Sequence, residues 1–134
     1  MFKLGDKLVE SKANQINPVV LAFVGDAVYS LFVREKYVFS HDFKAGELNA
    51  LTTAEVNATS QAKLVKEIMP LFTENELAIF KRARNAKKGT KAKNASVLDY
   101  NMSTGFEAVL GYLYIQGNYD RINFLLNKGI IEWK

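Results

Sequence analysis

Cysteine is absent from the 134 residues of this chain, and histidine occurs once, as His41. Without cysteine the chain has no disulfide bond and no thiolate metal ligand. A single histidine leaves little room for a zinc site or a Ser-His-Asp triad. No apolar run approaches the roughly 18 residues that indicate a membrane span. The first residues also lack the apolar centre of a signal peptide. We therefore expect a cytoplasmic protein without a membrane anchor.

Acidic residues are missing from one stretch, Lys81 to Lys93, which contains seven basic residues. The remaining residues comprise 11 basic and 14 acidic ones, so the positive charge forms a local patch. Such a patch attracts polyanions such as nucleic acid. It has no aromatic residue for base stacking, whereas its lysine, arginine, asparagine and threonine side chains suit the backbone of a duplex. A solvated surface loop is the alternative, and the lack of acids argues against it.

Alternating strand patterns and internal repeats are absent, and the length suits one domain with a modest core. We expect a single all-α domain. Asn17 and Pro18 predict the start of a first helix that runs to about Lys36. The next helical region lies between 45 and 69. It is either one long helix or two, because Thr52 and Glu55 could form an internal capping box.

The second half of the chain contains a clearer start signal. Thr73 and Glu76 form the pattern of a capping box and predict a third helix. Residues 86–94 are polar and lack periodicity, which predicts an exposed loop. Beyond it we expect a short helix over 95–100, a longer one over 106–115 and a last one over 118–127 with Gly129 past its end.

Two carboxylates lie inside apolar helical runs, Asp26 in Phe23–Tyr29 and Glu107 in Phe106–Tyr112. Burying an ionised carboxylate is costly unless something pairs with it. Gly25 and Gly111 would allow the two helix backbones to approach closely near the acids. Two facing carboxylates form a hard-oxygen site suited to Mg²⁺, which can activate water and stabilise the leaving oxygen in phosphodiester hydrolysis.

Each acid also has a structural interpretation. Asp26 could lie at the edge of an apolar face or bond to another helix. Glu107 could form a capping box with Thr104 at a helix start. Asp99 and Glu47 are further carboxylates that could join a metal site.

At these positions the chain resembles the ribonuclease III family. Its segment Leu21-Ala22-Phe23-Val24-Gly25-Asp26-Ala27-Val28 is similar to the family's signature helix, and Thr104-Gly105-Phe106-Glu107-Ala108-Val109-Leu110-Gly111 to its second acidic motif. The closest resemblance is to the Mini-III branch, bacterial proteins with only the catalytic domain. It rests on Arg82-x-Arg84-Asn85-Ala86-Lys87-x-Gly89-Thr90-x-x-Lys93-Asn94 and on Ser103-Thr104-x-Phe106-Glu107-Ala108.

The resemblance implies an Mg²⁺-dependent homodimeric endoribonuclease that cleaves both strands of double-stranded RNA, with precursor 23S ribosomal RNA as the natural substrate. Mn²⁺ would substitute for Mg²⁺. Asp26 and Glu107 are the expected catalytic metal ligands. We expect no double-stranded RNA-binding domain after Lys134. The basic segment would then grip the RNA, through Arg82, Arg84, Asn85, Lys87, Lys88, Lys91 and Lys93.

Two acids of the family pattern are missing. Ala22 stands where the larger family has glutamate, and Thr104 where it has aspartate. Mini-III proteins also lack the first acid, and Thr104 could support the metal shell through a water. A non-catalytic double-stranded RNA-binding or ribosome-assembly protein on the same fold is the alternative. A DNA-binding module fits less well, because nothing resembles a helix-turn-helix.

Overall fold

The computed structural model describes residues 6–40, 44–88 and 95–130. These residues form helices and no strand, which confirms the all-α class. Among them, no helix is both long and apolar enough to cross a membrane. The elements are α1 (Glu10–Ala13), α2 (Pro18–Ser40), α3 (Ala45–Val56), α4 (Ala58–Ile68), a 3-10 turn η1 (Met69–Leu71), α5 (Glu74–Asn85), α6 (Val97–Ile115) and α7 (Tyr119–Leu126).

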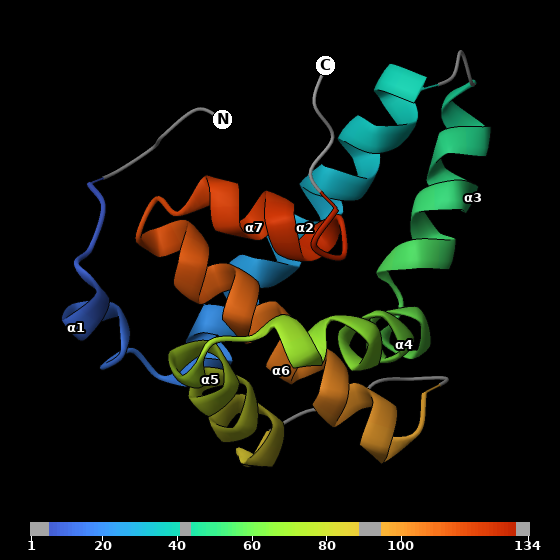
Figure 1. The fold of residues 1–134 in the computed structure, drawn as a ribbon. Coiled ribbons are helices and arrows are strands. Elements are labelled where there is room, and N and C mark those ends of the chain that lie inside the picture. Colours follow the sequence, from blue (N-terminus) through green and yellow to red (C-terminus); the bar gives the residue numbers. More distant parts are fainter. Residues whose placement is uncertain (1–5, 41–43, 89–94, 131–134) are drawn as a thin grey trace.

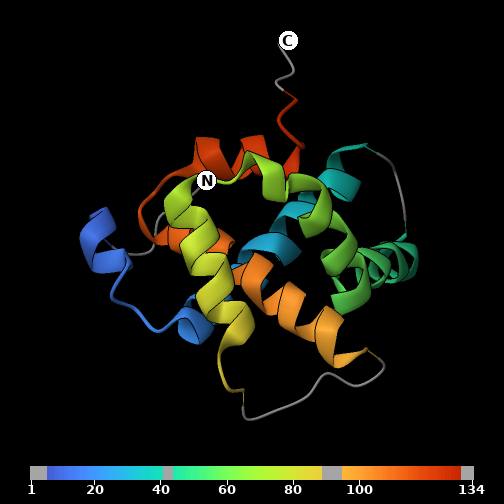
Figure 2. The same ribbon diagram turned by 60° about the horizontal axis from the view of Figure 1, so that its bottom comes forward.

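Helix α6 is the central element of the fold. It packs most extensively against α2 and also contacts α4, α5 and α7, as Figures 1 and 2 show. An unbroken run of buried residues, Ala108 to Leu113, explains this position, since a helix segment that is apolar all round must be covered on every side. The helices α2, α4, α5 and α7 therefore pack around α6.

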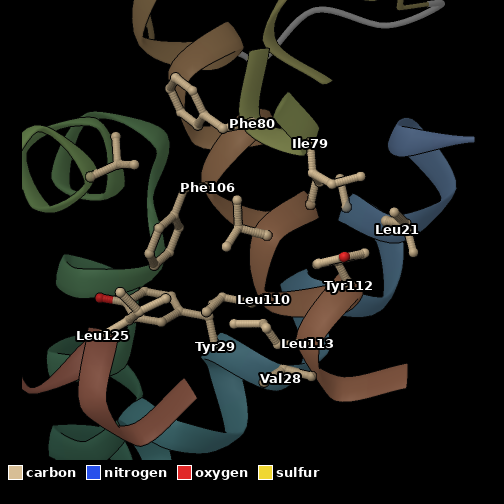
Figure 3. Close-up of a cluster of buried hydrophobic side chains, with 14 of the residues drawn as sticks. Leu21, Val28, Tyr29, Ile79, Phe80, Phe106, Leu110, Tyr112, Leu113 and Leu125 are labelled. Atoms are coloured by element: carbon tan, nitrogen blue, oxygen red, sulfur yellow. The ribbon is translucent and has the colours of Figure 1, made fainter. Parts of the chain in front are cut away.

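The core between these helices is rich in aromatic residues (Figure 3). Phe106 of α6 meets Tyr29 of α2 edge-to-face, with ring centroids 5.0 Å apart. Such aromatic pairs contribute about 0.5–1.5 kcal/mol beyond the burial of their area. Phe80 of α5 is fully buried and packs against Phe72. The aromatic contacts thus join α2 to α6 and hold α5 against the segment that precedes it.

The sequence wrongly predicted two helices where the structure has the single helix α6. Ser96 caps this helix by accepting a hydrogen bond from the Asp99 amide at 3.0 Å. The expected break lay between Tyr100 and Phe106, but Gly105 is buried there against the Phe80 ring. Gly105 therefore allows close packing and does not end a helix. Glu107 is consequently in mid-helix, and its proposed capping box with Thr104 does not exist.

The other boundaries are closer to expectation. Asn17 caps α2 through a bond from the Val19 amide to its side chain at 2.9 Å. This helix extends four residues beyond the predicted Lys36, to Ser40. The region over 45–69 contains two helices, and the cap of the second is Asn57, whose side chain accepts from the Ser60 amide. The capping box suggested at Thr52 is absent because α3 continues through it.

The predicted capping box of Thr73 and Glu76 is confirmed. Glu76 is buried and also receives two hydrogen bonds at 2.8 Å from the Arg121 guanidinium. The same guanidinium donates to the Leu71 carbonyl at 2.6 Å. A charge-assisted pair of this kind is stronger than a neutral hydrogen bond. It fixes the start of α5 to α7.

Helices α2 and α6 cross with their backbones in direct contact. A methyl group added to Gly25 would lie 1.6 Å from the Glu107 carbonyl oxygen, and one added to Gly111 would lie 1.9 Å from that of Leu21. The sequence predicted that these glycines allow the two helix backbones to approach closely, and the crossing confirms it. The crossing places the turn containing Asp26 directly beside the turn containing Glu107.

Replacing either glycine of this crossing should therefore push the central helices apart. We expect Gly25→Ala to lower the free energy of unfolding by at least about 3 kcal/mol, measured by urea denaturation. Gly46→Ala is the matched control, because an added methyl there meets nothing within 4 Å. It should stabilise α3 by about 0.5–1 kcal/mol. Equal effects of the two substitutions would contradict the close crossing.

Candidate active site

The crossing of α2 and α6 brings Asp26 and Glu107 into contact. Asp26 is exposed on α2, and Glu107 is partly buried on α6. A hydrogen bond joins the two carboxyl groups. The sequence-based hypothesis of two acids on facing helices is thus realised in the geometry.

The environment of Glu107 opposes its ionisation. Burial comes first, followed by the hydrogen bond to Asp26 and its charge, and together they raise the pKa of Glu107 to about 9. A hydrogen bond from Gln61 acts in the opposite direction. In the absence of a cation, the pKa of Glu107 therefore lies above neutral pH, and this carboxyl group retains its proton. A cation bound between the two carboxyl groups would favour their ionised forms and so oppose this shift.

The donor set fits a hard divalent cation. Carboxylate oxygens are the protein ligands that Mg²⁺ prefers, and one or two of them suffice when water and phosphate complete the shell. Among the described residues, no group of three or more acidic or histidine side chains is placed to hold a metal ion. Asp99 and Glu47 therefore do not join the pair in a larger cluster. Asp26 and Glu107 are the candidate ligands.

The two positions without the family's acids lie close to this pair. Ala22 is buried one turn before Asp26 and adds only a methyl group to the packing. Thr104 is also buried, and its hydroxyl donates to the Tyr100 carbonyl at 2.9 Å. Because that proton is already used, Thr104 could support a metal-bound water only as an acceptor.

Sequence reasoning missed Gln61. This residue lies on α4, and its side chain reaches Glu107 from a position that is only 2% exposed. It shares the buried face of α4 with Val65 and Ile68, at spacings of four and seven residues. The sequence signal that could have identified it is a polar residue at a helical spacing otherwise occupied by apolar residues.

The basic segment begins in the last turn of α5. Figure 2 shows this end of α5 on the same side of the molecule as the start of α6. Arg82 donates to the Asn14 carbonyl at 3.1 Å, and Arg84 donates to Asn85 and lies over the Phe80 ring. Both arginines thus also have structural contacts, whereas Lys87 is exposed.

Lys88 closes the end of α5. Its ammonium donates to the carbonyls of Arg84 and Ala86 at 3.1 and 2.9 Å, and partial burial lowers its pKa. This lysine satisfies helix-terminal carbonyls, a contact that the sequence did not predict. Lys91 and Lys93, the remaining predicted RNA contacts, lie outside the described residues.

Comparison with known proteins defines the class to which this fold and site belong. The model of the Ribonuclease III domain matches residues 19–118. The chain therefore belongs to the ribonuclease III family.

Relatives narrow the similarity further. Mini-ribonuclease 3 of Clostridium tetani is 42% identical over 127 residues, covering 93% of this chain and 83% of that protein. Mini-ribonuclease 3 of Staphylococcus aureus is 39% identical and covers 92% and 93%. The crystal structure of protein FN1578 from Fusobacterium nucleatum superimposes with a TM-score of 0.78 at 31% identity, covering 84% of this chain and 90% of that one. These similarities confirm the resemblance to the Mini-III branch.

The raised pKa of Glu107 predicts how stability depends on pH. Between about 4.5 and about 9 the folded protein holds a proton that the unfolded chain has released. The stability this proton contributes is complete below the unfolded pKa and is lost as the pH rises through the folded one. In EDTA, Glu107→Gln should therefore flatten the pH profile. At pH 8 it should raise the free energy of unfolding by on the order of 1 kcal/mol, a few degrees in Tm.

Glu35→Gln is the control for this measurement, because Glu35 is exposed on α2. It should leave the profile as in the wild type. A wild-type stability that does not fall between pH 6 and 9 in EDTA would refute the raised pKa.

Proposed function

We propose that this protein is an Mg²⁺-dependent endoribonuclease that cleaves both strands of double-stranded RNA. The observation that carries the proposal is the contact between Asp26 and Glu107 at the crossing of α2 and α6. Membership of the ribonuclease III family and similarity to proteins named Mini-ribonuclease 3 support it. The natural substrate that the resemblance implies is the paired ends of precursor 23S ribosomal RNA in the cytoplasm.

Asp26 and Glu107 would hold the metal ion, which Mn²⁺ could replace. When bound, the ion would supply activation of water and charge stabilisation at the leaving oxygen. Glu107 must first release its proton, which the nearby cation and Gln61 both favour. Asp26 is an exposed residue, so a phosphodiester could approach the pair of acids from the side of α2.

The segment that begins at Lys81 would hold the RNA backbone. Lys87 is exposed at its end, and Arg82, Arg84 and Lys88 keep the neighbouring backbone in place through their own contacts. Binding through phosphates carries no sequence preference and suits recognition of a duplex by its shape. Asn85, also exposed, can bond to sugar hydroxyls.

A homodimer is the second part of the proposal. Phe23 is 81% exposed on α2, three residues before Asp26. Val20 and Ala27 are exposed at spacings of three and four residues from it, so the three side chains form one apolar stripe. A second copy covering this stripe would remove it from water. RNA would then lie across two sites brought together by the subunits.

Substitution of Asp26 tests the catalytic assignment. Asp26→Asn keeps the size of the side chain and removes a ligand charge. We expect loss of at least about 1000-fold in cleavage of a perfect RNA duplex with Mg²⁺, and unchanged RNA binding in EDTA. Asp120→Asn is the control, because Asp120 is an exposed acid on α7. This variant should cleave the duplex as the wild type does.

Full activity of Asp26→Asn would overturn the assignment. No cleavage by the wild type with any divalent ion, together with tight duplex binding, would favour the non-catalytic RNA-binding alternative.

Substitution of Phe23 tests the dimer. Phe23→Arg places a charge in the apolar stripe, and light scattering at micromolar concentration should show a monomer where the wild type is a dimer. Phe39→Arg is the matched control, because Phe39 is 84% exposed near the far end of the same helix. It should remain dimeric. A monomeric wild type, or a dimer that survives Phe23→Arg, would contradict the proposed interface.

A further inference from the structure

Gln61 occupies a position where packing alone would favour an apolar side chain. It is 2% exposed and shares the buried face of α4 with Val65 and Ile68, both of which are fully buried. Burying an amide without hydrogen bonds costs on the order of 1–3 kcal/mol. Its presence therefore requires specific partners for its polar atoms.

One partner is the end of α3. The Gln61 side-chain nitrogen donates to the Val56 carbonyl at 3.0 Å. Val56 is the last residue of α3. Its carbonyl lacks a hydrogen-bond donor from a following helical turn, because the helix ends there and Asn57 has an extended backbone. Gln61 thus satisfies a carbonyl exposed by the break.

The residue before that carbonyl bonds to α2. Glu55, the residue before Val56, accepts hydrogen bonds from the Lys36 ammonium at 2.7 and 2.8 Å and from the Tyr37 hydroxyl at 2.7 Å. The end of α3 is therefore attached to the same helix that carries Asp26. Gln61 is consequently anchored to a point whose position is fixed relative to α2.

The other partner is Glu107. A primary amide carries two N–H donors, so Gln61 can donate to Val56 and to a second acceptor at once. Its side chain hydrogen-bonds to the Glu107 carboxyl group, which also contacts Asp26. Gln61 therefore approaches Glu107 from α4 while Asp26 approaches it from α2.

We propose that Gln61 is a positioning residue that holds the Glu107 carboxylate beside Asp26 by linking it to the end of α3. This inference rests on the proposed function. Partners of metal-binding side chains orient the ligand, and their loss costs about 10–100-fold in metal affinity or activity. A contact of this kind matters more where few protein ligands share the metal. Here the buried Ala22 and Thr104 supply no acid.

The test uses Gln61→Met, which keeps the length of the side chain and removes both donors, and Gln61→Leu as a second apolar variant. Gln116→Met is the matched control. Gln116 makes the same kind of bond, to the Tyr112 carbonyl at 2.9 Å, but lies nine residues beyond Glu107 on the chain. At 1.5 Å per residue this is about 14 Å away along the helix direction.

Cleavage of a duplex RNA is measured over a series of Mg²⁺ concentrations. We expect both Gln61 variants to lose about 10–100-fold in kcat with KM for RNA unchanged, and to need more Mg²⁺ for half-maximal rate. Without RNA, more Mg²⁺ should be needed to raise their Tm. RNA binding in EDTA should equal that of the wild type, and Gln116→Met should match the wild type throughout.

Wild-type kcat and Mg²⁺ dependence in both Gln61 variants would overturn the proposal. So would a defect confined to KM, an equal loss in Gln116→Met, or failure of both Gln61 variants to fold, since Gln61 would then serve the α3–α4 junction alone. If the wild type is active and Asp26→Asn inactive, such results refute only the role of Gln61. If the wild type does not cleave duplex RNA with any divalent ion, the proposed function is refuted, and this inference with it.

Discussion

The direct contact between the backbones of α2 and α6 is the constraint on which the rest of the structure depends. Gly25 and Gly111 leave no space for a side chain at the crossing. Because the helices meet so closely, the aromatic rings of Tyr29 and Phe106 pack edge-to-face beside it. The same contact brings two carboxylates together. Stability and the candidate site therefore depend on the same pair of glycines.

This arrangement keeps two acids in contact in a partly buried position, at an electrostatic cost. Burial and the proximity of Asp26 keep Glu107 protonated at neutral pH. Without a metal ion, ionising both carboxyl groups of the pair is therefore unfavourable. Strongly shifted pKa values of this kind are typical of functional sites, and a bound cation would compensate the two negative charges. The hydrogen bond from Gln61 is the described contact that favours the ionised form of Glu107.

The basic segment divides into structural and exposed cations. The charges of Arg82 and Lys88 are directed to backbone carbonyls, and Arg84 lies over an aromatic ring. These contacts fix the end of α5, from which Lys87 extends into solvent. Some cations of the basic segment thus stabilise the end of the helix from which the exposed cation extends.

The sequence alone determined the helical class, the capping box of Thr73 and Glu76, the close helix approach that Gly25 and Gly111 allow, and the pairing of Asp26 with Glu107. These follow from local periodicity, from capping chemistry and from the cost of burying a charge. Only the tertiary structure decided that α6 is one helix, because Gly105 is buried against a ring distant in sequence. It alone also brought Gln61 to Glu107, since that contact depends on how α4 packs against α6, which no local pattern encodes.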